Sequence, residues 1–455
     1  MIEKRGVKRM AAKMKQPYSW LVLTLCSALL ARIWVFYSKT PNLSGDSFAY
    51  LNAARVLRGE NVPSTIDKIV IIPRNETLGR PIYPMFLNLA FAIGRWSPTS
   101  PKVLEKIKEQ QPYLPDDWHW HFFITKENLK MIQLLQHLLG LLATIFAFLI
   151  LWEWTKSGWL SFLGSLFAIG WKFRNGFLGL ELRITTEFLA TVFLIFIIYL
   201  LIQTQKNRWS IRWMIITLII SYLLALTRPN FIFLLPLLGL YFIWNLSSYN
   251  NRFNYLRILI IVILPILILL GGWKTYMSIS AYHFSFTPDA FEDPILCQTL
   301  KEHLSQNPND RHAIVVIRPI LMKRWNTSWE ETNRRISYET KKALRRRPEV
   351  FLQSVLWGLV NYFSRGGIGW GGIRPFSLIL AFFNILGLLA LIIHTTPSTL
   401  KVALWISLLN ALICSIIMGI NAEQARYALP VEPIMNFATF WIIHFLIQKF
   451  LICKY

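Results

Sequence analysis

The stretch Thr186–Phe231, TEFLATVFLIFIIYLLIQTQKNRWSIRWMIITLIISYLLALTRPNF, decides the fold class of this chain. Two long apolar runs, at 186–204 and 211–227, flank the basic linker 205–212. A helix needs about 20 predominantly apolar residues to cross the hydrocarbon core of a bilayer. The stretch therefore predicts two membrane-spanning helices joined by a short turn.

The same pattern recurs along the chain, which is 54% hydrophobic and only 16% charged. An ordinary soluble domain is about 25% charged. Spans are predicted at 19–37, 130–152, 158–173, 186–204, 211–227, 229–247, 256–274, 375–394, 401–420 and 429–450. We therefore expect an all-α polytopic membrane protein, a bundle of about ten transmembrane helices and at most about 13.

Basic segments set the expected orientation. The N-terminus and the linkers 205–212 and 248–257 are rich in Lys or Arg, which favours the cytoplasmic side. Two long polar stretches then face outward, and the short apolar pieces within them, 81–96 and 349–364, are interpreted as interfacial helices. The predicted divisions are a basic N-terminus (1–18), a transmembrane module (19–274) with the first outer loop (38–129), a second outer loop (275–374) and a C-terminal transmembrane module (375–455). We expect the first span to be uncleaved.

The net charge of +24 is interpreted as contact with anionic membrane lipid, since no nucleic-acid-binding motif accompanies it. Three of the four cysteines lie in or beside apolar runs, so no disulfide is expected. The segment 116–121, DDWHWH, is interpreted as an exposed polar loop, and no metal site is assigned to it.

Ionisable residues are nearly absent from the middle of the predicted spans. Transporters usually keep such residues near the middle of the membrane, where a moving ion needs a partner. The sequence therefore predicts chemistry at the outer membrane face.

Asp46 begins a short amphipathic helix that Gly59 ends. Tyr50 follows one helical turn later, on the same side as Asp46. Ser44 and Asp46 are also suitable N-cap residues, so a capping role is open beside a chemical one.

Short polar motifs recur at the predicted outer helix ends. They are Asp46, Tyr50, Ala54, Leu57 and Gly59; then Arg80-Pro81-Ile82-Tyr83-Pro84; then Thr186-Glu187; and finally Arg426, Tyr427, Pro430 and Pro433. In this order the chain resembles the polyprenyl-phosphate-sugar-dependent glycosyltransferases of the C-type (GT-C) superfamily, which include protein O-mannosyltransferases and the lipid A aminoarabinose transferase. It departs from them in two places: many relatives have a second acid where this chain has Ser47, and Lys-Pro-Pro where it has Arg80-Pro81-Ile82.

The resemblance implies a GT-C-like bundle that moves a sugar from a polyprenyl-phosphate donor to a protein, lipid or glycan acceptor. The active site would face outward from a bacterial inner membrane. Asp46 would be the general base and Arg426 the phosphate-binding cation. Further candidate substrate-binding residues are Tyr50, Arg80, Glu187, Arg228, Arg374 and Tyr427. Dependence on a divalent metal is left open, and no other cofactor is implied.

Plainer roles stand beside these. Arg80, Arg228 and Arg426 are also typical interfacial anchors, and Glu187 suits the positive end of a helix dipole. The glycine-rich segment 364–376, which Arg374 flanks, also fits a flexible loop. The alternative functions are a transporter or flippase of lipid-linked sugars and a non-enzymatic scaffold.

Overall fold

The computed structural model describes residues 17–41, 47, 50, 51, 53, 54, 57, 81–94, 126–170, 177–249, 384–418 and 428–452, and isolated positions between 263 and 382. These residues are almost all helical or in turns. The exception is a two-residue antiparallel ladder of β1 (Ile368–Gly369) and β2 (Gly372–Ile373), in the glycine-rich segment. The prediction of an all-α fold is confirmed for the described part of the chain.

Among the described residues, six helices are long and apolar enough to cross a membrane. They are α2 (Pro17–Ser38), α8 (Lys126–Thr155), α11 (Thr186–Lys206), α13 (Leu234–Tyr249) with the preceding turn η2 (Pro229–Phe231), α21 (Ser398–Met418) and α23 (Glu432–Ile452) with η5 (Leu429–Val431). The chain is therefore a membrane protein, and six of the predicted spans are found close to their expected bounds.

Two other predicted spans are described in part or as a shorter helix. The run 158–173 is described up to residue 170, where it forms α9 (Gly158–Ser165) and a π-helical turn, η1 (Leu166–Gly170). The run 211–227 forms α12 (Ile211–Thr227), a shorter apolar helix. In the run 375–394, position 382 and residues 384–388 are helical, and the 3-10 turn η4 (Leu389–Leu391) follows. The run 256–274 is described only at isolated positions, so the number ten stays a prediction.

The predicted helices of the first loop are helical wherever the structure describes them. The piece 81–96 forms α5 (Ile82–Ile93). In the segment after Asp46, called here the first-loop helix, all six described positions are helical. Ser47, Tyr50, Leu51, Ala53 and Ala54 are buried, while Leu57 is exposed. A helix is therefore correct for this segment, whereas its amphipathic character and the interfacial position of α5 stay predictions.

The chain divides into two compact units. The first contains residues 1–283, 383–407 and 429–455, and the second contains 284–382 and 408–428. Within the second unit, the side chain of Asn410 donates a hydrogen bond of 2.5 Å to the Tyr362 hydroxyl.

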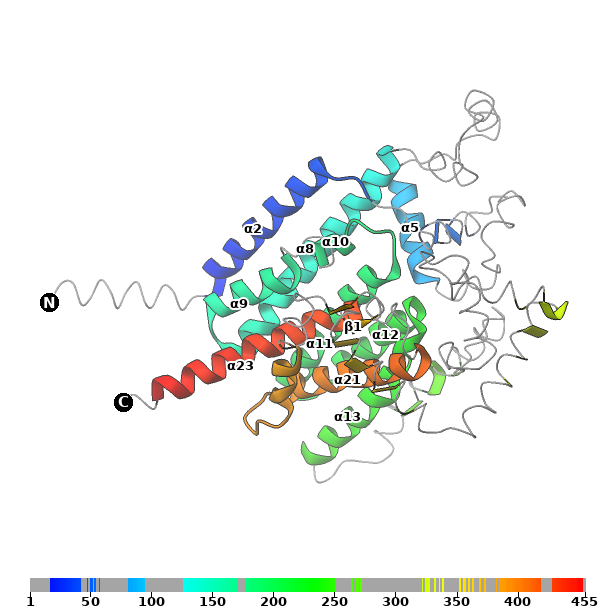
Figure 1. The fold of residues 1–455 in the computed structure, drawn as a ribbon. Coiled ribbons are helices and arrows are strands. Elements are labelled where there is room, and N and C mark those ends of the chain that lie inside the picture. The colour runs from blue at the N-terminus through cyan, green and yellow to red at the C-terminus, as the bar shows by residue number, and fades with distance from the viewer. Residues whose placement is uncertain are drawn as a thin grey trace. The chain divides into compact units, whose positions relative to one another are not determined.

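In the first unit, α11 lies at the centre and packs against α8, α12 and η5 (Figure 1). In the apolar 18-residue stretch of α11 that could cross a membrane, 78% of the residues are buried, compared with 22% in the corresponding stretch of α2. The outer face of α2 instead exposes large apolar side chains, among them Val22, Leu30 and Trp34. Such a face suits contact with lipid, because hydrocarbon tails cover it without loss of hydrogen bonds.

The helices of this unit alternate in direction between two ends, named here for one acid at each. At the Glu153 end, the Glu153 carboxylate lies 2.7 Å from Lys156 Nζ and 2.5 Å from Lys206 Nζ. At the Glu187 end, α2 and α12 end while α8 and α11 begin, and Lys130 Nζ donates to the Lys39 carbonyl at 2.7 Å. This alternation agrees with the order of directions predicted for these spans.

Candidate functional site

The segment Glu181–Glu187, ELRITTE, connects two buried polar clusters at the Glu187 end. It follows the short helix α10 (Phe177–Leu180), and the Arg183 N–H donates back to the Leu180 carbonyl at 3.0 Å. The backbone becomes extended at Thr185, with φ −146° and ψ 154°, and α11 begins at the next residue. One short turn thus places an acid in each of the two clusters.

The first cluster forms where α12 ends. A residue before proline is disfavoured in helical conformation, and Arg228 before Pro229 is extended, with φ −142° and ψ 107°. Its guanidinium Nη1 lies 3.1 Å from Oε1 of Glu187, which stands in the first turn of α11. The two side chains are 3% and 1% exposed, so this ion pair is buried.

Two tyrosines complete this Glu187 cluster, defined as Tyr50, Tyr83, Thr185, Thr186, Glu187 and Arg228. The Tyr50 hydroxyl lies 3.5 Å from the Thr186 hydroxyl. The Tyr50 ring meets the Tyr83 ring edge-on, with centroids 5.2 Å apart. Burial raises the pKa of the Tyr83 phenol well above its ordinary value, and the nearby Tyr50 and Glu187 add to this. Tyr83 therefore remains a neutral hydroxyl at physiological pH.

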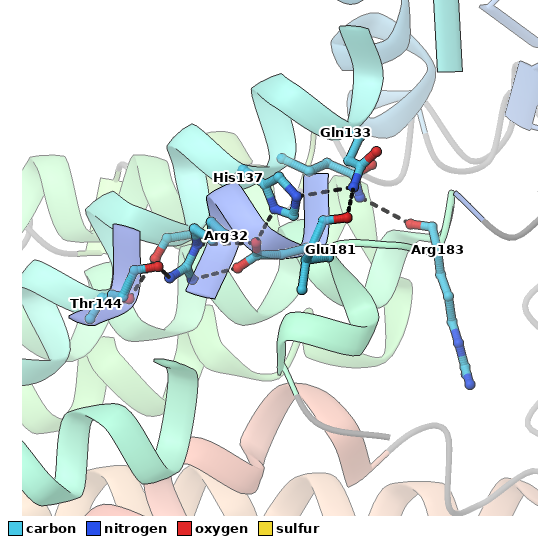
Figure 2. A network of polar contacts seen from close by, with 10 residues as sticks. Arg32, Gln133, His137, Thr144, Glu181 and Arg183 are labelled. Carbon is cyan, nitrogen blue, oxygen red and sulfur yellow. Dashed lines mark hydrogen bonds and ion pairs between the residues drawn. The ribbon is translucent and has the colours of Figure 1, made fainter. Parts of the chain in front are cut away.

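The second cluster, the Glu181 network, consists of Arg32, Gln133, His137 and Glu181 (Figure 2). Arg32 grips the Glu181 carboxylate with two nitrogens, Nη2 to Oε1 at 2.5 Å and Nε to Oε2 at 3.1 Å. His137 Nδ1 lies 2.5 Å from Oε2 of the same carboxylate. A bidentate pair of this kind is among the stronger polar contacts in proteins. The Glu181 network as a whole connects α2, α8 and the turn before α11.

The partners of His137 indicate its tautomer. Since a carboxylate can only accept, Nδ1–H donates to Glu181, and Nε2 accepts from the Gln133 amide at 3.2 Å. The neighbouring Gln136 amide donates to the Arg183 carbonyl at 3.0 Å. Figure 2 shows the Arg183 side chain turned away from the network, so only its backbone takes part.

Close packing at Gly140 brings α8 against this network. A Cβ at this position would overlap Oε1 of Glu181 and would lie 2.8 Å from Nη2 of Arg32. Glycine is therefore the residue that leaves room for the Arg32–Glu181 pair.

The Glu181 network corrects the expectation that ionisable residues are nearly absent from the spans. Arg32 and His137 lie within the apolar helices α2 and α8, and both are buried. Neither residue was among the predicted site residues, because each stands alone in an apolar run. Their presence there was itself a signal, since an ionisable residue inside a span needs a buried partner.

Of the predicted site residues, the structure brings together Tyr50, Glu187 and Arg228. The interpretation of Arg228 as an interfacial anchor is wrong, because its side chain is buried against Glu187. Glu187 does stand in the first turn of a helix, as expected, and it also holds this arginine. The segment 116–121 lies outside the described residues. The same holds for the remaining predicted site residues, which are Asp46, Arg80, Arg374, Arg426 and Tyr427.

No protein-family model matches this chain, and no curated protein matches it either. Within the described part of the chain, no group of three metal-ligating side chains comes together. The Glu187 cluster offers a cation, a carboxylate and several neutral hydroxyls, which suits the binding of a polar ligand.

Proposed function

We propose that this chain is an integral membrane glycosyltransferase that moves a sugar from a polyprenyl-phosphate donor to a hydroxyl-bearing acceptor. One observation carries the proposal: the buried Glu187–Arg228 pair lies beside Tyr50, at the end of the bundle where the first-loop helix packs. Tyr50 is four residues after Asp46 in the sequence, the spacing that predicts one shared helical face.

A transfer of this kind needs a base and a cation. The acceptor hydroxyl attacks the anomeric carbon and gives its proton to Asp46, as the bond from that carbon to the phosphate oxygen breaks. The departing polyprenyl phosphate keeps the electron pair, and arginine stabilises its charge. Arg80, Arg374 and Arg426 are the candidates for the phosphate, since Arg228 is already paired with Glu187.

The position of η5 supports a contribution from the C-terminal motif. This turn packs against α11, whose first residues carry Glu187. Arg426 and Tyr427 stand just before η5 in the sequence. The apolar outer face of α2 offers a surface for an isoprenoid tail.

The proposed orientation follows from charge. The basic linker 205–212 lies at the Glu153 end, and the positive-inside rule favours the cytoplasm for that end. The Glu187 end then faces outward, in keeping with a bacterial inner membrane enzyme whose acceptor is a protein, lipid or glycan.

The test is a transfer assay with the purified full chain in lipid nanodiscs and a panel of polyprenyl-phosphate sugars. Asp46→Asn should abolish transfer while the protein still inserts and unfolds at the same temperature. Asp67→Asn, the same change in the same loop, is the matched control and should keep wild-type transfer. Near-normal transfer by Asp46→Asn would show that Asp46 is not the base.

A transporter or flippase of lipid-linked sugars is the second candidate, and the Glu181 network favours it. Buried ionisable groups between membrane helices are typical of transport pathways. Flux of a fluorescent lipid-linked sugar across proteoliposomes, without any transfer to an acceptor, would support this function over the first.

A further inference from the structure

Two buried hydroxyls in the Glu187 cluster have hydrogen-bonding capacity to spare. Tyr83 is 0% exposed and its oxygen meets the Thr185 backbone, which leaves its O–H without an acceptor among the described residues. Thr185 is 5% exposed, and its Oγ1 has no partner among the described residues. Thr185 is the N-cap residue of α11, a position where threonine normally caps the helix, yet its side chain makes no capping bond. Buried polar groups are nearly always paired, so two such hydroxyls in one cluster indicate a ligand.

The surroundings of these hydroxyls define the chemistry of that ligand. Glu187 and Arg228 carry opposite charges and balance each other. The phenol of Tyr83 is kept neutral, and the hydroxyls of Tyr50 and Thr186 lie close by. Hydroxyl groups both donate and accept, as does the combination of a carboxylate with a guanidinium.

We propose that the Glu187 cluster binds a neutral polyol, the ring of a sugar, whose hydroxyls pair with Tyr83 and Thr185. This rests on the proposed function and assigns the sugar, not the phosphate, of the substrate to this cluster. The Glu187 carboxylate disfavours an anion in the same place, because like charges repel strongly where water is excluded. Since both hydroxyls are buried, the edge-on contact between Tyr50 and Tyr83 has to open for the ring to enter.

Binding is tested on the full chain in nanodiscs by calorimetry, with empty nanodiscs as the reference. The probes are octyl glucoside, octyl galactoside and octyl mannoside, compared with octyl phosphate of the same chain length. Saturable binding of at least one glycoside is expected, together with about fivefold weaker binding in Tyr83→Phe and in Thr185→Val. Tyr241→Phe is the matched control, since the Tyr241 hydroxyl is also buried but lies beside Ser398, near Trp209 at the far end of α11.

Thermal unfolding separates binding from structure. Because Thr185→Val removes an unpaired polar group and keeps the shape, its unfolding temperature should equal or exceed that of the wild type. Tyr83→Phe also removes the contact with the Thr185 backbone, so its unfolding temperature should fall slightly. A lower unfolding temperature of Thr185→Val would indicate that its hydroxyl stabilises the fold and would contradict the ligand role. Binding of octyl phosphate alone, or of no probe, would overturn the proposal.

The outcomes also separate this proposal from the enzymatic one. Glycoside binding that both variants weaken, without transfer in any assay, supports the sugar site and contradicts the transferase. Sugar transfer by the wild type, together with unchanged glycoside binding in both variants, supports the transferase and contradicts the sugar site.

Discussion

Glu181 and Glu187 are six residues apart, both buried, and differently surrounded. Both oxygens of Glu181 are engaged, one by Arg32 and the other by Arg32 and His137. Around Glu187, the Thr185 hydroxyl has no partner among the described residues, and the Tyr83 oxygen meets the Thr185 backbone. The Glu181 network also contains an atom without a partner among the described residues, Gln133 Oε1, so the contrast lies in the central carboxylate. A network whose central carboxylate is satisfied holds helices together, whereas a cluster with spare hydroxyls is suited to bind a ligand.

The largest expected effect comes from breaking the Arg32–Glu181 pair. Glu181→Leu leaves the Arg32 charge buried without its carboxylate and should cost about 3–5 kcal/mol of unfolding free energy. Denaturation in mixed detergent and SDS measures this loss. The double variant Arg32→Met with Glu181→Leu should recover most of it, because no buried charge remains. A double variant as unstable as the single one would show that the pair holds the helices beyond balancing its charges.

A smaller loss is expected from crowding the same pair. Gly140→Ala places a methyl group against the Glu181 carboxylate and should cost about 1–3 kcal/mol, measured in the same denaturation assay. The matched control is Gly271→Ala, since a Cβ at position 271 meets no atom within 4 Å. Equal stability of the two variants would contradict the tight packing described at Gly140.

The Glu187 cluster should respond in the opposite way, with more effect on function than on stability. Glu187→Gln removes the counter-charge of Arg228 but keeps the shape and an acceptor oxygen beside it, so the cost should be about 1–3 kcal/mol, less than for Glu181→Leu. Sugar transfer should nevertheless fall, because the amide no longer fixes the arginine. A variant that loses stability as severely as Glu181→Leu would remove the distinction between the two clusters.

The smallest effect concerns alkaline pH. Tyr83 has a pKa raised above its ordinary value of 10.0 by burial, so its contribution to stability is complete below about pH 10 and is lost as the pH rises through the folded-state value. The unfolding temperature of the wild type should therefore fall more steeply above about pH 10 than that of Tyr83→Phe. Parallel curves would mean that the phenol is as accessible in the folded protein as in the unfolded chain.

Local signals in the sequence predicted the elements well. Long apolar runs predicted the membrane helices and the end of α12 at residue 227, and a helix was predicted for the segment after Asp46. These features depend on neighbouring residues, whose steric and hydrophobic effects act over one or two turns. The same signals placed Glu187 at a helix start, but they did not reveal that Arg228 is its partner.

By itself, the sequence determined that this is a membrane protein of long apolar helices with polar turns between them. Only the tertiary structure decided which faces meet, because a membrane helix is apolar on the side toward lipid as well as on the side toward protein. The pair Arg32 and Glu181, 149 residues apart, could therefore not be found from local pattern. Burial away from water is what makes such pairing obligatory, and burial is a property of the packed bundle.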